Sequence, residues 1–516
     1  MSLWNRRTLA FPLAAAAAAL AMTAPGAEAA GTVTGTATGT ATGTATGTAA
    51  PTVPVTWSAC EGKGLDPRQE CATVSVPLDY RAPDGPRLDL AVSRIRSEHP
   101  DRRRGALLLI PGGPGGSSWK DPSAKLAKLP RSVRDTYDIV GFDPRGVGRS
   151  APISCGLSHE DVALTALRAW PGPGGDISRN VASARRTADA CLRDGGPVLR
   201  SVSTVNEARD IDSVRRALGQ EKLSAWGVSY GTYVGSVYAT MFPDRTDRVV
   251  LDSNDDPNPE LVERGWLANA GVGAEDRFPD FARWAAAPER GADRIARTPA
   301  EVRPLFLRLA ARLDRHPLPW PGANPAELNG NVLRQAMYDA LYDDGRFPAL
   351  AELISAASDP AHRALPAPNT PPDAAMQNTA AMTVATLCND VSWPKSVPAY
   401  AEAVAANRAR YPLTAGQPAG ITPCAFWPAA PVDKPVRVTP RGPSDILLVQ
   451  NLRDPASPYS GALNLRRAFG DRARMIAVDA GGHGSYLAHG NACGDALVTD
   501  YLVTGQRPGR DVTCRS

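Results

Sequence analysis

The chain carries little net charge for its length. Its 516 residues include 57 Lys and Arg against 53 Asp and Glu, so the formal net charge is +4. No long basic run is visible in the sequence. Nucleic-acid-binding proteins carry a basic patch or stripe that meets the phosphates. The sequence therefore predicts no nucleic-acid partner.

The sequence also lacks the spacings of common cofactor sites. No two of the eight cysteines form a C-x-x-C pair, and no histidine cluster lies near any of them. Such pairs and clusters are typical of zinc sites. No G-x-G-x-x-G motif opens a helix after a strand, as dinucleotide binding requires. We therefore expect neither a metal ion nor an organic cofactor.

Beyond the first thirty residues no stretch is long and apolar enough to span a bilayer. Residues 1–30 carry two basic residues, Arg6 and Arg7, near the start. An alanine-rich apolar stretch follows, and then a small-x-small cleavage site at 27–29. This order is typical of a secretory signal peptide. The paired arginines permit twin-arginine export, and an N-terminal membrane anchor is the alternative. No cysteine precedes Cys60, which excludes a lipoprotein anchor.

Residues 31–55 are of low complexity and consist mainly of repeated Gly, Thr and Ala. Such a segment cannot bury enough apolar surface to fold, and we expect a flexible linker. Association with the cell wall is an alternative role for it. The sequence thus predicts a secreted, extracellular protein that no longer contacts the membrane once the signal peptide is removed.

An exported chain with eight cysteines is expected to form disulfides. The number of possible pairings is too large for sequence alone to settle them. Proximity along the chain favours Cys60–Cys71, Cys155–Cys191, Cys388–Cys424 and Cys493–Cys514.

Short apolar segments alternate with helix-like segments through much of the chain. Strands are predicted at 71–80, 88–97, 106–110, 137–142, 223–228, 248–253, 445–450 and 473–478. This alternation predicts an α/β fold with a mostly parallel sheet covered by helices on both faces. We assign its core to residues 56–255 and 441–516. Residues 256–440 have few strand signals and predict an inserted helical cap.

The segment Gly227-Val228-Ser229-Tyr230-Gly231 is the one G-x-S-x-G in the sequence. An apolar run precedes it and a helical run follows it, which is the context of a nucleophile elbow. Glycines two positions either side of the serine would let the turn close tightly. The helix behind Ser229 would point its amides at a developing negative charge. Ser229 is therefore the predicted nucleophile.

A serine nucleophile needs a base and an acid, which in this context follow it in the order acid, then histidine. His483 lies among glycines five residues after the predicted strand at 473–478, and His489 is the alternative. Asp454 lies four residues after the preceding predicted strand, and Asp479 is the alternative acid. We predict a triad of Ser229, Asp454 and His483.

The tetrahedral intermediate needs two backbone donors for its oxyanion. The amide of Tyr230 is the first candidate. The second is expected from the glycine-rich loop after the strand at 106–110, at Gly112 or Gly113.

The motifs PGGPGGSS, FDPRGVGRS, GVSYGTYVGSVYA, LRDPASP and GGHGSY occur in this order. In this the chain resembles secreted α/β-hydrolase peptidases related to prolyl aminopeptidase, and among them the bacterial tripeptidyl aminopeptidases. It departs from the prolyl enzymes at Pro111, where they usually carry histidine. The resemblance implies cleavage from a free N-terminus, with acidic groups of the cap binding the substrate ammonium. The candidates for these acidic groups are Asp255, Asp256, Glu260 and Asp390.

The resulting expectation is a secreted serine aminopeptidase that removes di- or tripeptides from free N-termini through an acyl-enzyme. We expect a monomer whose partner is a peptide substrate. A secreted carboxylesterase or lipase using the same triad is the main alternative, and a non-catalytic binding protein is the second.

Overall fold

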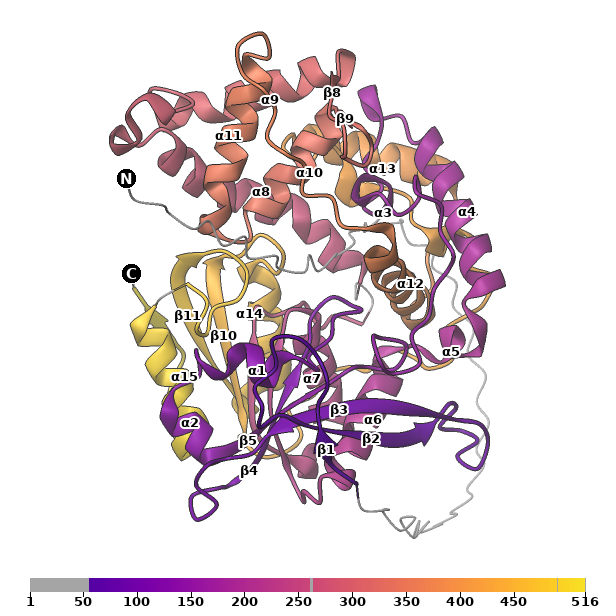
Figure 1. Ribbon diagram of the computed structural model, residues 1–516, viewed down its shortest axis with the longest axis vertical. Coiled ribbons are helices and arrows are strands. Elements are labelled where there is room, and N and C mark those ends of the chain that lie inside the picture. Colours follow the sequence, from indigo (N-terminus) through magenta and orange to yellow (C-terminus); the bar gives the residue numbers. More distant parts are fainter. Residues whose placement is uncertain (1–54, 260–262, 490, 516) are drawn as a thin grey trace, which may run out of the picture.

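The computed structural model describes residues 55–259, 263–489 and 491–515 (Figure 1). The predicted signal peptide, the linker up to residue 54 and the candidate Glu260 lie outside the described residues. In the described ranges no helix is long and apolar enough to cross a membrane.

The core of the described chain is a ten-stranded sheet with the order β1-β2-β3-β5-β4-β6-β7-β10-β11-β12. All pairs from β5 to β12 are parallel, and those from β1 to β5 on the other side are antiparallel. The strands are β1 (Ser58–Ala59), β2 (Glu70–Pro77), β3 (Arg87–Ile95), β4 (Gly105–Ile110), β5 (Tyr137–Phe142), β6 (Leu223–Val228), β7 (Thr246–Asp252), β10 (Ile446–Arg453), β11 (Ala473–Gly481) and β12 (Val512–Cys514). A separate pair contains β8 (Leu318–Pro319) and β9 (Glu327–Leu328). The predicted mostly parallel sheet is confirmed, whereas β12 was not predicted.

Burial along the strands explains this arrangement. Every residue of β4 and of β5 is buried, as in strands covered on both faces. The first half of β3 alternates exposed and buried residues, as in a strand with one solvated face. Continuous apolar segments therefore form the centre of the sheet, and alternating segments form its antiparallel edge.

Helices cover both faces of the sheet. Leu107 and Leu109 of β4 pack with helices α2 and α15, whereas Leu108 and Ile110 pack with α6 and α7. Neighbouring residues of one strand thus enter opposite cores. The helices that cover the two faces of the sheet are α1 (Asp121–Leu126), α2 (Arg131–Thr136), α6 (Thr204–Ala217), α7 (Tyr230–Met241), α14 (Tyr459–Phe469) and α15 (Ala492–Thr504).

A helical layer lies above the sheet in Figure 1. Between β7 and β10 the chain forms α8 (Arg264–Ala285), α9 (Pro299–Arg315), α10 (Gly330–Ala340), α11 (Phe347–Ser358), α12 (Asp373–Asp390) and α13 (Val397–Arg410). The segment after β5 adds α3 (Leu164–Leu167), α4 (Ser178–Asp194) and α5 (Gly196–Ser201). Arg168 joins the two insertions, because its Nη1 lies 3.0 Å from Oδ1 of Asp339. The loops that leave β4, β6, β7 and β10 all reach one cavity beneath this cap.

All four predicted disulfides are confirmed: Cys60–Cys71, Cys155–Cys191, Cys388–Cys424 and Cys493–Cys514. Cys388–Cys424 ties α12 to the short 3-10 helix Pro423–Phe426 within the cap. No free cysteine remains, since the eight bonded cysteines are all those of the sequence.

Removing the Cys388–Cys424 disulfide should destabilise the protein. The two residues are 36 positions apart, and opening a loop of this length costs about 3–4 kcal/mol through chain entropy. We expect the double variant Cys388→Ser/Cys424→Ser to lose about this much free energy of unfolding in chemical denaturation. The Cys60–Cys71 pair closes a shorter loop of 11 positions, and its removal should cost less. An unchanged denaturation midpoint for the 388–424 variant would contradict this expectation.

Candidate active site

Ser229 occupies the tight turn between β6 and α7. Its backbone has φ 58° and ψ −130°, a region that residues other than glycine rarely adopt. A Cβ at position 227 would lie 2.4 Å from the carbonyl oxygen of Gly231, and one at 231 would lie 2.5 Å from that of Ile110. Both glycines are therefore required for the close approach of β4, β6 and α7 that presents the serine.

The pairing of β10 with β11 brings His483 to Asp454. Both strands run further than predicted, to Arg453 and Gly481, and these two residues are partners across the ladder. Asp454 and His483 follow directly after this last pair. Nδ1 of His483 lies 3.0 Å from each carboxylate oxygen of Asp454.

The carboxylate of Asp454 is held in place by its own loop. It is buried, and Oδ1 also accepts hydrogen bonds from the backbone N–H groups of Ala456 and Ser457 at 2.9 Å each. The alternative acid, Asp479, pairs instead with Arg453 at 2.6 Å and is 43% exposed. The alternative base, His489, has its Nε2 3.4 Å from the carbonyl oxygen of His483. The structure thus brings together the pair that the sequence favoured.

The end of β7 connects the serine turn to the histidine loop. The backbone N–H of Ser229 donates to the carbonyl oxygen of Asp252 at 3.0 Å. The Asp252 carboxylate accepts from the backbone N–H groups of Ser485 and Tyr486 at 2.8 and 3.0 Å. Ser253 Oγ accepts from that of Gly484 at 2.8 Å. Sequence reasoning missed this role of Asp252 and Ser253, although the polar run that ends the predicted strand at 248–253 was visible.

The glycine-rich loop after β4 lies against the serine. A Cβ at Gly112 would be 3.0 Å from Cβ of Ser229 and 2.9 Å from the carbonyl oxygen of Val228. The amide of Tyr230 is the first of α7 and has no partner within the helix. The Tyr230 side chain points elsewhere, since its hydroxyl lies 2.8 Å from Thr204 Oγ1. The predicted oxyanion donors therefore border Ser229.

Ser229 lines a small cavity of about 30 Å³. Its walls come from the loops after β4, β7 and β10 and from helices α8, α10 and α12 of the cap: Gly113, Pro114, Asp255, Trp266, Ala270, Tyr338, Leu387, Ala456 and Ser457. His483 lines a separate and much larger cleft of about 830 Å³.

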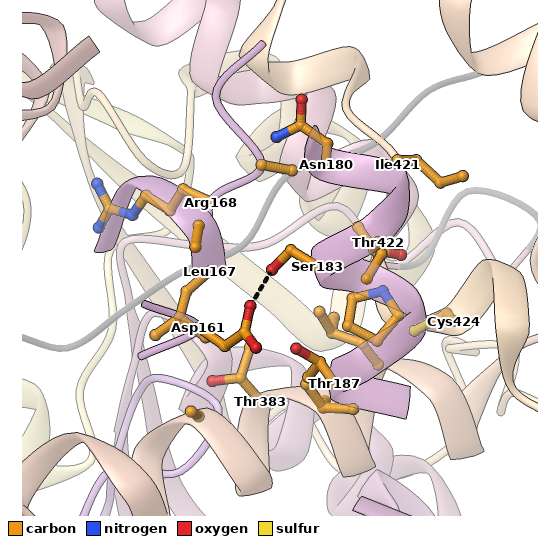
Figure 2. A pocket seen from close by; sticks show the side chains of 17 residues that line it. Asp161, Leu167, Arg168, Asn180, Ser183, Thr187, Thr383, Ile421, Thr422 and Cys424 are labelled. Carbon is orange, nitrogen blue, oxygen red and sulfur yellow. Dashed lines mark hydrogen bonds between the residues drawn. The ribbon is translucent and has the colours of Figure 1, made fainter. Parts of the chain in front are cut away.

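Figure 2 shows a third pocket, between α4 and α12, of about 40 Å³. Asp161, the acidic group in its wall, is already bonded to Ser183 at 2.7 Å and to Arg186 at 2.7 Å. None of the three predicted triad residues lines it. This pocket shares Leu387 with the serine cavity but lacks the chemistry of the site.

The acidic candidates for ammonium binding occupy different places. Asp255 lines the serine cavity, and burial is the main reason that its pKa rises to about 7. Asp256 accepts a hydrogen bond from Asn464 Nδ2. Asp390 is buried at the end of α12, where Thr204 donates to it from both its N–H and its hydroxyl. Glu263, which sequence reasoning missed, is the neighbour of Asp390.

Glu263 and Asp390 form a buried acidic pair close to Tyr230, the residue after Ser229. Glu263 has no exposed surface, and neither of its carboxylate oxygens accepts a hydrogen bond from another described residue. Burial raises the pKa of Glu263 well above its ordinary value, and the Asp390 carboxyl raises it further. Burial also raises the pKa of Asp390, although Glu263 and Thr204 partly offset this. Glu263 stands three residues beyond Glu260, so a scan of the whole acidic segment would have included it.

The pKa of His483 lies above its ordinary value of 6.5. Burial is the largest single effect and lowers it. The charge and hydrogen bond of Asp454, with the charges of Asp255 and Asp252, raise it by more. The ring of Tyr342 packs edge-on against His483 at 5.0 Å, and its carbonyl oxygen accepts from the His483 backbone N–H.

A serine on a strand–helix elbow, with a following aspartate–histidine pair at the ends of two parallel strands, defines a serine hydrolase of the α/β-hydrolase fold. The family described as "alpha/beta hydrolase fold" matches residues 105–306. The family described as "TAP-like protein" matches residues 409–514.

Several bacterial proteins are similar to this chain over most of its length. The tripeptidyl aminopeptidase of Streptomyces lividans is 36% identical over 476 residues, covering 89% of this chain and 86% of its own. The serine protease Hip1 of Mycobacterium tuberculosis (strain H37Rv) is 30% identical over 488 residues, covering 89% and 91%. Carboxylesterase B of the same strain is 30% identical, covering 89% of each. The chain belongs to the α/β-hydrolase family that includes these tripeptidyl aminopeptidases.

The raised pKa of His483 predicts the pH dependence of turnover. A general base must be neutral, so kcat/KM should rise with pH through a pKa above 6.5. Asp454→Asn removes the charge that raises the pKa of His483, whereas the burial that lowers this pKa remains. The rising limb of the pH–rate profile should therefore move to lower pH. The kcat of Asp454→Asn should fall by about three to four orders of magnitude. The matched variant Asp479→Asn should keep both the limb and the rate, and pH–rate profiles of the three proteins decide the matter.

Proposed function

We propose that the protein is a secreted serine aminopeptidase that releases di- or tripeptides from free N-termini through an acyl-enzyme. The observation that carries this proposal is the buried pair Glu263 and Asp390, which lies close to Tyr230, the residue after Ser229. An apolar acyl group offers neither a hydrogen-bond donor nor a positive charge to two buried carboxyl groups. A substrate ammonium would supply both.

In the proposed reaction Ser229 Oγ attacks the scissile carbonyl carbon while His483 Nε2 accepts its proton. The amides of Tyr230 and of Gly112 or Gly113 stabilise the oxyanion. His483 then gives the proton to the leaving amine, and the C–N bond breaks. Water, deprotonated by His483, releases the acyl group and restores Ser229. Asp454 orients His483 throughout and stabilises its cationic form.

The position of the acidic pair supports release of more than one residue. Trp266 and Leu387 line the serine cavity, and Asp390 stands three residues after Leu387 on α12. Residues three apart share a helix face, so Asp390 lies about one turn along α12 from the cavity wall. Glu263, the N-cap residue of α8, lies beside Asp390. Asp255, by contrast, lies beside His483, where an ammonium would sit close to the scissile bond.

The raised pKa values suit this role. A protonated buried carboxyl avoids the cost of an isolated charge, and an arriving ammonium lets it ionise. Binding of the free N-terminus should therefore release a proton from the Glu263–Asp390 pair.

Secretion is supported by composition and by the disulfides. All eight cysteines are bonded, which is typical of oxidising compartments. The N-terminal thirty residues have the order of a signal peptide.

A secreted carboxylesterase is the second candidate function. The relative named Carboxylesterase B is 30% identical over most of the chain, and the same triad hydrolyses esters.

Three substrates separate the two functions: a tripeptide anilide with a free N-terminus, its N-acetyl counterpart and a short acyl ester. We expect the free-amine anilide to be cleaved with the highest kcat/KM, measured by release of the chromophore. Ser229→Ala should abolish turnover without changing the melting temperature. Ester hydrolysis without cleavage of the free-amine anilide would refute the peptidase and support the esterase.

Neutralising the acidic pair tests the anchor directly. Glu263→Gln or Asp390→Asn should lower kcat/KM for the free-amine anilide about 10- to 100-fold, since a hydrogen bond to a charged group contributes about 1.5–3 kcal/mol. The loss should fall mainly on KM, and ester turnover should persist. Asp276→Asn, at an exposed position of α8, is the matched control. Equal losses for the amine and ester substrates would contradict an anchoring role.

A further inference from the structure

The space on the histidine side of the site is far larger than that on the serine side. Ser229 lines the cavity of about 30 Å³, whereas His483 lines the cleft of about 830 Å³. The larger volume lies in the range of binding sites for sizeable ligands, about 300–1,000 Å³. The reaction itself determines what each space receives.

In acyl transfer the two halves of the substrate take different directions from the scissile bond. The carbonyl carbon bonds to Ser229 Oγ and its oxygen faces Gly112, Gly113 and Tyr230, so the acyl half lies on the serine side. The leaving nitrogen must reach His483 to receive its proton. We propose that the cleft lined by His483 binds the polypeptide that follows the scissile bond. This inference rests on the proposed peptidase function and assigns the leaving half of its substrate.

The walls of this cleft extend well away from the triad. They are formed by α10 and α11, by the segment before α3, by the loop between β8 and β9, and by residues 366–371 before α12. The lining carries four acidic side chains, Asp339, Asp343, Glu352 and Asp373, against Lys128 and Arg346. Asp339 is paired with Arg168 and Asp373 with His159. Both signs of charge remain on the rim, which suits a polypeptide of varied sequence.

Residues 366–371 form one wall of the cleft, and their backbone is available to bind a peptide. The segment Pro366-Ala-Pro-Asn-Thr-Pro371 lies outside the helices and strands of the fold. Trp320 Nε1 donates to the carbonyl oxygen of Pro366 at 2.7 Å. Within the described chain, residues 367–371 make no backbone–backbone hydrogen bond. Pro368 and Pro371 have no N–H. The N–H groups of Ala367, Asn369 and Thr370 and the carbonyl groups of the segment can pair with an extended peptide, as a strand added to an edge does.

Substrates that differ only in the leaving half test this assignment. Each carries the same free tripeptide, followed by one, three or six alanines and a C-terminal amide, so that the bond broken is always an alanyl amide. We expect kcat/KM to rise at least about tenfold from one to six residues, which corresponds to about 1.4 kcal/mol of added binding. Product release is followed by mass spectrometry.

A variant that fills the cleft should remove this gain. Ala349 is exposed on α11 and lines the cleft, so Ala349→Trp adds bulk there without disturbing a core. In this variant the ratio of kcat/KM between the six-residue and the one-residue substrate should fall close to one. Ala405→Trp, at an exposed position of α13 outside the cleft, is the matched control and should keep the full gain.

The outcomes separate this inference from the proposed function. Cleavage of all three substrates with equal kcat/KM would overturn the leaving-group cleft and leave the aminopeptidase standing. A gain that persists in Ala349→Trp would also overturn it. Failure to cleave any free-amine peptide, with ester turnover intact, would overturn both.

Discussion

The buried carboxylate of Asp252 is the constraint on which the site depends. The backbone carbonyl oxygen of Asp252 accepts a hydrogen bond from the serine turn, and its two carboxylate oxygens accept hydrogen bonds from the backbone that follows His483. Burial raises the pKa of Asp252 to about 6, and the backbone bonds from Ser485 and Tyr486 partly offset this. A buried charge persists only with such partners, so the loop geometry and the ionisation of Asp252 support each other. This one residue positions the proposed base, His483, relative to the proposed nucleophile, Ser229, although it belongs to neither loop.

Further buried acidic groups surround the cavity beneath the cap. Asp252, Asp255 and Asp454 all lie close enough to His483 to raise its pKa against burial. Glu263 and Asp390 form a second buried acidic group, close to Tyr230. The core of the fold thus supplies the charges that act on the reacting atoms. The cap supplies Trp266, Leu387 and the acids that would select the substrate.

Much of the fold and part of the site followed from local pattern. The buried segments predicted the parallel strands, because strands covered on both faces need continuous apolar runs. The glycines of the elbow marked Ser229, and the order of the motifs indicated Asp454 and His483. The predicted strands ended too early, at 450 and 478, whereas the pairing continues to Arg453 and Gly481. The polar residues Asn451 and Asp479 end the apolar pattern before the strands themselves end. The acidic segment that contains Glu263 was visible in the sequence. The pairing of Glu263 with Asp390 and the leaving-side cleft were not, because each arises from segments that are distant in sequence.

The sequence by itself determined the sheet, the elbow, the order of the reacting residues and the cysteine pairs that lie close along the chain. Each of these depends on neighbouring residues, whose spacing follows strand and turn geometry. Only the tertiary structure decided that Asp479 turns to Arg453 while Asp454 faces His483. It also decided that Ser229 and His483 open onto cavities of very different size. These features depend on the register between strands and on the packing of the cap, which no short segment encodes.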